Sequence, residues 1–166
     1  MTIYRYTDDG DVCMDGDLGV YAVANVKQAF EVRATRKGYS SPVVAKLVRK
    51  GRDRTLPAPA DFSGLKAFSS TTFQDSSGKV VSTTTASFCP NGYESVRRSP
   101  KVPDTSPYPQ AYSLGVVWGL QAGYATSLSG GNDYDGDDDS GGLPDLKPGS
   151  YVATTSITAP YRKALG

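Results

Sequence analysis

The sequence contains no histidine, and its 166 residues include only two cysteines, two methionines and one tryptophan. Without histidine the chain lacks the most common general base, the most common transition-metal ligand and every serine–histidine or cysteine–histidine nucleophile pair. Its carboxylates cluster in polar loops, without the apolar surroundings that would raise a pKa for general acid catalysis. We therefore expect a protein that is not an enzyme.

Long apolar runs are also missing, because no stretch approaches the roughly 20 residues that span a bilayer. The opening residues MTIYRYTDDGDV lack the basic-then-apolar order of a secretory signal. The composition, rich in threonine, tyrosine and glycine, nevertheless favours an exposed protein, outside the cell or on a virion surface. With 38% hydrophobic and 21% charged residues, the length fits a single domain over residues 1–166.

Hydrophobic periodicity runs at two residues almost throughout, which is the spacing of half-buried strands. It predicts about seven strands, over residues 17–24, 29–36, 43–50, 67–74, 79–88, 112–124 and 150–158. Residues 43–50 could also form a helix, but their β-branched side chains favour a strand. The turn residues DSSG at 75–78 predict a hairpin between 67–74 and 79–88, and the first two strands could form another.

This pattern predicts an all-β fold, an immunoglobulin-like antiparallel β-sandwich, with a barrel as the alternative. Three segments stand apart from the strands: the acidic N-terminal segment 1–16, the proline-rich loop 89–111 and the aspartate- and glycine-rich loop 129–149. Phe62, in a loop stiffened by prolines, is the expected anchor of that loop in the core.

Basic residues concentrate between residues 27 and 54, where nine lysines and arginines face only Glu31 and Asp53. Such a patch can bind a polyanion. The preferred interpretation is that these side chains line solvent-facing strands, because no nucleic-acid reader motif accompanies them. Nucleic acid is therefore not an expected partner.

The loop NDYDGDDDSGG brings alternating carboxylates together, an arrangement that a hard cation such as Ca²⁺ prefers. The candidate ligands are Asp133, Asp135, Asp137 and Asp139. The loop fails the EF-hand template, which would need glycine at Asp138 and glutamate at Pro144. A solvated loop without metal is the default, and no other cofactor is expected.

The two cysteines, Cys13 and Cys89, could form one disulfide, which would close a loop of about 75 residues and stabilise the fold by roughly 4 kcal/mol. Two separate thiols are the equal alternative. Tyrosines in or near the long loops suit a protein or carbohydrate contact surface, although packing at the sandwich edges explains most of them. The tyrosines proposed for that surface are Tyr93, Tyr108, Tyr112 and Tyr134.

Four segments occur along the chain in the order SFCPNGYES, TSPYPQ, YSLGVVWGLQAGYA and LKPGSYVATTSITAPYRKALG. This order resembles the non-catalytic N-terminal region of actinobacterial lysyl-oxidase-like secreted proteins. The resemblance implies a companion β-domain, since copper-dependent amine oxidation in that family belongs to a separate, histidine-containing domain. The family pattern has a second cysteine after SPYP, where this chain has Gln110 and Ala111, so the resemblance leaves Cys13 as the partner of Cys89.

The family also continues into a further strand beyond YRKALG, which suggests a sheet edge completed by a neighbouring chain. We therefore expect a non-enzymatic domain that acts through protein assembly or surface adhesion, for example as a phage virion decoration or fibre component, in which copies of the chain could form a homo-oligomer or lattice. The alternatives are a Ca²⁺-dependent adhesion or carbohydrate-binding module and an accessory domain of a secreted oxidase.

Overall fold

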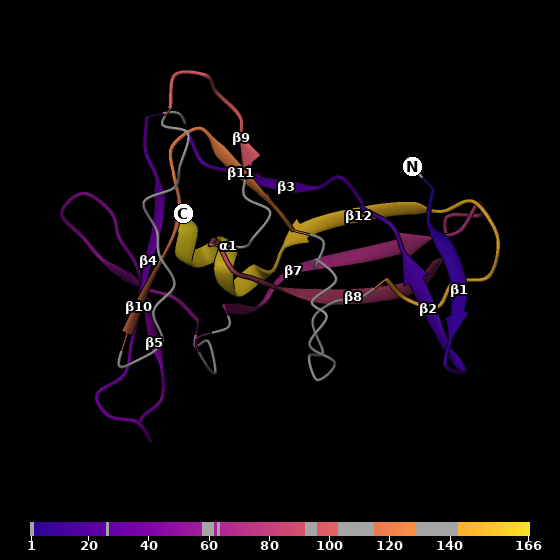
Figure 1. Ribbon diagram of the computed structural model, residues 1–166, viewed down its shortest axis with the longest axis horizontal. Helices are drawn as coiled ribbons and strands as arrows, with labels where there is room; N and C mark the ends of the chain where they lie inside the picture. The colour runs from indigo at the N-terminus through magenta and orange to yellow at the C-terminus, as the bar shows by residue number, and fades with distance from the viewer. Residues whose placement is uncertain are drawn as a thin grey trace.

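The computed structural model describes residues 2–25, 27–57, 62, 64–91, 96–102, 115–128 and 143–166. These residues form antiparallel strands and one short helix, so the predicted all-β class is confirmed (Figure 1). The elements are β1 (Tyr4–Asp8), β2 (Asp11–Asp15), β3 (Tyr21–Val23), β4 (Phe30–Thr35), β5 (Val44–Leu47), β6 (Arg54–Thr55), β7 (Leu65–Gln74), β8 (Val80–Phe88), β9 (Val96–Arg97), β10 (Gly115–Leu120), β11 (Tyr124–Ser127), β12 (Val152–Ile157) and α1 (Ala159–Leu165).

The strands form four antiparallel sheets rather than the two of a simple sandwich. Sheet A is the β1-β2 ribbon, sheet B has the order β3-β11-β9, sheet C has the order β10-β4-β5-β6 and sheet D has the order β12-β7-β8. Seven strands is therefore an underestimate for the described residues, and the immunoglobulin-like arrangement stays a prediction. Figure 1 shows sheet D extending sideways from sheet C, with sheet A near its far end.

Sheet D is built around the hairpin that the sequence predicts most clearly. β7 and β8 pair from Leu65–Phe88 to Gln74–Val80, and the turn between them is held by Asp75. Its Oδ1 accepts hydrogen bonds from the Ser77 main-chain N–H at 2.9 Å, the Ser77 hydroxyl at 2.6 Å and the Lys79 N–H at 3.1 Å. These bonds lower the pKa of Asp75, the Ser77 hydroxyl being the main cause.

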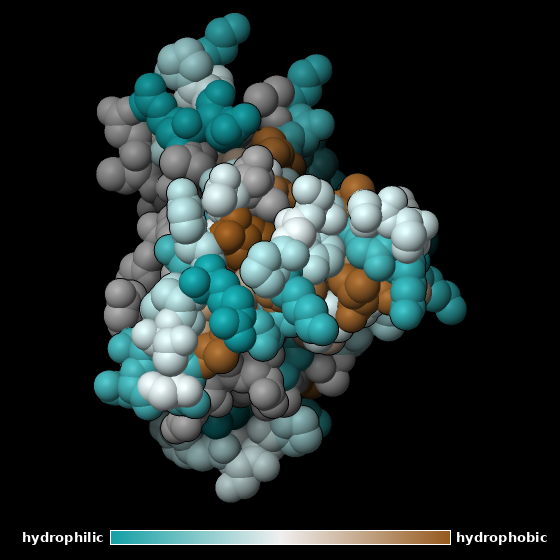
Figure 2. Space-filling view, turned by 90° about the vertical axis from the view of Figure 1, so that its right-hand side faces the viewer, coloured by the Kyte–Doolittle hydropathy of each residue, from teal (hydrophilic) through white to brown (hydrophobic). Residues whose placement is uncertain are grey.

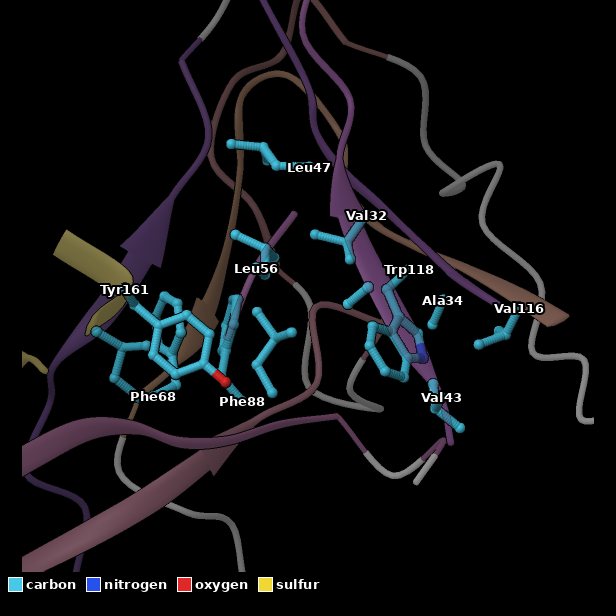
Figure 3. Close-up of a cluster of buried hydrophobic side chains, with 13 residues drawn as sticks. Val32, Ala34, Val43, Leu47, Leu56, Phe68, Phe88, Val116, Trp118 and Tyr161 are labelled. Atoms are coloured by element: carbon cyan, nitrogen blue, oxygen red, sulfur yellow. The ribbon is translucent and has the colours of Figure 1, made fainter. Parts of the chain in front are cut away.

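The main hydrophobic core lies where sheet C meets the near end of sheet D. Alternate residues of β4 and β5 point inward from sheet C, as their periodicity predicts, and Trp118 of β10 joins them. Figure 3 shows Trp118 beside Ala34, Val43 and Val116, and Phe88 beside Phe68 and Tyr161. Phe68 and Phe88 are stacked with their ring centroids 4.6 Å apart. Phe62 packs against this core, as expected.

The C-terminal helix α1 covers the aromatic side of the core, although periodicity did not indicate a helix there. Tyr161 packs against Phe68 at 5.0 Å between ring centroids, and its hydroxyl donates to the Lys66 carbonyl at 3.0 Å. Burial raises the pKa of Tyr161, which keeps this donor protonated. Pro160 near the start and Gly166 at the end are ordinary helix boundary signals.

The helix is fastened to a bulge in β7 where Ala67 has a φ of 49°. Register shifts between Leu65 and Ser69, so the bulge turns successive carbonyls toward the C-terminal segment. Thr158 donates twice there, from its hydroxyl to the Ala67 carbonyl and from its N–H to the Phe68 carbonyl, both at 2.8 Å. The bulge and the helix therefore stabilise each other.

Two expectations about strand pairing are wrong. The first two predicted strands do not form a hairpin, because β3 pairs with β11 while β4 lies between β5 and β10. The predicted strand 112–124 is also shorter, since the chain turns at Gly123 with a φ of 81° and continues as β11 in another sheet. In both cases a strand pairs with one that is distant in the sequence and not with its sequence neighbour.

Candidate functional site

Most of the residues proposed from the sequence for binding fall outside the described ranges. These are the four candidate Ca²⁺ ligands Asp133, Asp135, Asp137 and Asp139 and the four candidate contact tyrosines Tyr93, Tyr108, Tyr112 and Tyr134. Both proposals stay predictions. Among the described residues, histidine, cysteine, aspartate and glutamate side chains do not gather in any group of three or more that could hold a metal ion.

The two cysteines lie in different parts of the fold and are both thiols, not a disulfide. Cys13 is on β2 in sheet A, where it pairs with Tyr6 and its thiol lies 3.9 Å from the Asp11 carbonyl. Cys89 follows β8 and packs against the main core. The thiol alternative therefore describes this structure, because β2 lies toward the far end of sheet D and Cys89 at its core end (Figure 1).

The basic segment 27–54 is divided among several structural roles. Arg49 and Arg54 donate to the Leu165 and Ala164 carbonyls at the end of α1, at 3.0 and 3.2 Å, where a positive charge complements the helix dipole. The Arg36 guanidinium lies 5.2 Å from the ring centroids of Tyr39 and Phe62, a cation–π arrangement. At least three of the nine basic side chains of this segment therefore have partners within the fold.

The aspartate-rich loop 129–149 and the acidic segment 1–16 are connected by an ion pair. Arg5 of β1 donates to both carboxylate oxygens of Asp145, at 2.8 and 3.4 Å. This hydrogen bond lowers the pKa of Asp145 and raises that of Arg5. The pair is exposed and so contributes little to stability, but it shows that segment 1–16, as the β1-β2 ribbon, lies against residues 143–149.

The clearest surface feature is one face of sheet D, which we call the hydroxyl face. Register places cross-strand neighbours in rows on this face: Thr154, Thr72 and Thr83 in one row, and Ser156, Ser70 and Thr85 in the next. A third row at the far end contains Val152, Gln74 and Val80. Residues directly opposite each other in a sheet share a face, so these side chains form one continuous surface.

The hydroxyl face is open to solvent and carries no charge. On its two outer strands Thr83, Thr85, Thr154 and Ser156 are exposed, and the Thr72 and Thr83 hydroxyl oxygens lie 3.5 Å apart. At its far end Val152 is 60% exposed, Val80 49% and the neighbouring bulged Val81 43%. Figure 2, which views the molecule from that end, shows hydrophobic groups among the polar ones on this side.

The opposite face of sheet D is buried. Ser69, Thr71 and Phe73 of β7 all point inward, and the Ser69 hydroxyl donates to the Leu128 carbonyl at 3.2 Å. Thr71 meets Thr155 through their hydroxyls at 2.8 Å. Because this buried face and the Asp75 turn fix the strands, the hydroxyl face is a rigid surface that needs no ordering when a partner binds.

The outer face of sheet C provides a useful comparison because it carries charged residues among exposed valines and Thr35. Arg33 and Lys46 are cross-strand neighbours there, and Arg33 pairs with Glu31 at 3.2 Å. Charged residues of this kind keep an exposed sheet soluble and separate. The hydroxyl face lacks them, which identifies it as the candidate contact surface. The uncharged residues of this face alternate along β7, β8 and β12 in the sequence. Taken alone, this alternation predicts only strands.

Two segments that carry the family resemblance contact each other within the fold. Asn91 of the FCPNGY segment accepts a hydrogen bond from the Gly119 N–H at 2.6 Å and donates to the Val117 carbonyl at 3.2 Å. Both partners belong to β10, which comes from the LGVVWGLQAGY segment. The Asn91 side chain thus satisfies main-chain groups on the outer edge of β10. This contact between the two segments stabilises the fold.

Comparisons with protein-family models, with curated proteins and with solved structures found no match. None of the described helices is long and apolar enough to cross a membrane. The hydroxyl face and the strands that form it are therefore the features of the fold that bear on function.

Proposed function

We propose that this protein is a non-catalytic β-domain that acts by assembly or adhesion, with the hydroxyl face of sheet D as its contact surface. The observation that carries the proposal is the absence of charge from that face, in contrast to the charged outer face of sheet C. Burying valine and hydrogen-bonded hydroxyl side chains costs much less than burying charges, so a flat partner that supplies hydrogen bonds can cover this face. A virion decoration or fibre component is the specific form we favour.

Rigidity supports the same proposal. A preformed surface binds without the entropic cost of ordering its side chains, and β-branched threonine and valine have few rotamers to lose. The exposed valines at the far end supply apolar area, and the threonine rows supply hydrogen bonds. This mixture of apolar and neutral polar groups is typical of protein–protein contact surfaces.

The experiment that tests the proposal is co-sedimentation of the purified chain with particles or envelope isolated from its natural source. A lysine replacing Thr154 places a charge in the middle row of the hydroxyl face. The matched control is Thr35→Lys, which makes the same exchange on an exposed strand position of sheet C. We expect the Thr154→Lys chain to remain in the supernatant while the control and the parent chain sediment.

The proposal is wrong if the parent chain fails to sediment with either fraction, or if the two lysine variants sediment alike. The alternative of an accessory domain of a secreted oxidase would be favoured by copurification with a histidine-containing oxidase domain. The Ca²⁺-dependent alternative would be favoured by a higher melting temperature in millimolar Ca²⁺ than in excess chelator.

A further inference from the structure

We propose that β8 is a self-pairing edge, through which two copies of this chain join their D sheets antiparallel about a twofold axis at Thr84. This inference rests on the proposed function and names a second copy of the chain as one partner of sheet D. In the strand order β12-β7-β8, β8 is an outermost strand. No strand among the described residues pairs with its outer side.

The direction of the main-chain groups in β8 follows from the register. The Thr158 N–H bonds to the Phe68 carbonyl, so Phe68, Ser70 and Thr72 direct their main-chain groups toward β12. The alternate residues Ser69 and Thr71 then direct theirs toward β8. Their partners are Ala86 and Thr84, whose main-chain groups therefore point back to β7. The intervening Thr83 and Thr85 direct their N–H and C=O groups to the outer edge.

Those outward groups fit a second copy of the same strand. In an antiparallel pair centred on Thr84, Thr83 of one copy lies opposite Thr85 of the other, and each such pair exchanges two hydrogen bonds. The register matches outward groups with outward groups on both sides of the axis. In a register centred between two residues, the outward N–H and C=O groups of one copy would face residues of the other copy whose main-chain groups point to β7. Such registers are therefore excluded.

The side chains of β8 are also compatible with self-pairing. From Val80 to Phe88 the strand contains no charged residue and no proline, so neither charge repulsion nor a missing N–H prevents the contact. Opposed threonines are favourable cross-strand pairs. The bulge at Val81 limits the contact to Ser82–Ala86, and within that span Thr83 and Thr85 keep the hydroxyl face continuous from one copy to the other.

The other outer strand of sheet D, β12, is a poorer candidate. It spans only Val152–Ile157, and the chain then turns directly into Thr158 and α1, which fold back over the β7 bulge. The β8 edge is longer, spanning Val80–Phe88. An isologous contact between two copies is the commonest form of protein oligomer, and β8 provides the self-complementary strand that it needs.

Oxidative cross-linking of the full chain tests the register directly. Only the residue on the twofold axis meets its own copy, so Thr84→Cys should form a disulfide across the axis and migrate at twice the chain mass without reductant. Peptide mapping should show residue 84 linked to residue 84, which separates this bond from any made by Cys13 or Cys89. The matched control is Thr35→Cys, at an exposed position of the interior strand β4 of sheet C, which should remain a single chain.

The inference is overturned if Thr84→Cys cross-links no more than Thr35→Cys. Sedimentation of the parent chain and of Thr83→Pro gives an independent test, because proline at that position removes an outward N–H and leaves the bonds to β7 in place. We expect the parent to dimerise with increasing concentration and the proline variant to stay monomeric; a monomeric parent overturns the inference. Failure here leaves the Thr154→Lys co-sedimentation test of the proposed function unaffected, so the two outcomes are distinguishable.

Discussion

The two ends of the β7-β8 hairpin differ in almost every physical respect. The near end places Leu65, Phe68 and Phe88 in the main core, under α1. The far end leaves Val80 and Val152 about half exposed, beside rows of uncharged threonine. One pair of strands therefore serves both purposes: its near half joins the main core, and its far half presents a surface on one face while burying Phe73 on the other. Exposed apolar side chains also occur on the other sheets, so the far end of sheet D differs from them by combining such side chains with rows of uncharged threonine.

The largest loss of unfolding free energy is expected for a substitution at the core end of β8, and almost none for one at its exposed end. Phe88→Ala removes a ring that contacts Phe30 and Phe68 in the core, which should cost about 3–5 kcal/mol of unfolding free energy. Val80→Ala, at the exposed end of the same strand, should change it by no more than about 0.5 kcal/mol. Urea unfolding of both variants measures the difference. Equal losses would contradict the division of the hairpin.

A smaller effect concerns the contact between α1 and the β7 bulge. Tyr161→Phe keeps the ring in the core and removes only the hydroxyl that donates to the Lys66 carbonyl. We expect a loss of about 0.5–1.5 kcal/mol, measured by the same urea unfolding. Tyr4→Phe, on the exposed strand β1, is the control and should leave stability unchanged. A neutral Tyr161→Phe variant would show that the helix is held by packing alone.

The bulge itself provides a test with the opposite sign. Ala67 adopts a φ of 49°, a left-handed conformation that disfavours a Cβ atom. Glycine tolerates this conformation, so Ala67→Gly should stabilise the protein by about 0.5–1 kcal/mol. Ala153→Gly, on the regular strand β12, should instead destabilise it by a similar amount. If thermal unfolding shows both variants to be less stable, the bulge does not have the conformation described.

The smallest expected effect lies at the turn that ends the hydroxyl face. Because hydrogen bonds lower the pKa of Asp75, its carboxylate stabilises the folded state above the unfolded-state pKa, and this contribution disappears as pH falls through the folded-state pKa. Asp75→Asn should therefore lower the melting temperature slightly at neutral pH and not in strong acid. Asp53→Asn is the control for removing a charge. A lower melting temperature of Asp75→Asn that persists in strong acid would contradict the role of the carboxylate.

Local periodicity predicted the strands well but not their partners. It located β4, β5, β7, β8 and β12, because alternating residues in each of them mark a buried face. It missed the β1-β2 ribbon, although Asp9 and Gly10 form an Asp-Gly turn between alternating strands, a known hairpin signal. It also failed to place β4 between β5 and β10, since pairing over long separations depends on the whole core.

The candidate site was less predictable than the fold. The aspartate and tyrosine clusters attracted attention because charged and aromatic residues carry recognisable chemistry, whereas threonine rows have no motif. Only the register shows that Thr72, Thr83 and Thr154 come together from three strands. The helix α1 was missed for a related reason, because seven residues are too few for a clear helical period, and only Pro160 and Gly166 indicate its limits.

The native mass of the chain isolated from its natural source shows whether sheet D is a contact surface for assembly or adhesion. Light scattering over a range of concentrations gives that mass without labels or tags. We expect an assembly heavier than one chain of 17.6 kDa, whose mass Thr154→Lys lowers and Thr35→Lys leaves unchanged. A mass of 17.6 kDa at every concentration, with no association with particles or envelope, would contradict it.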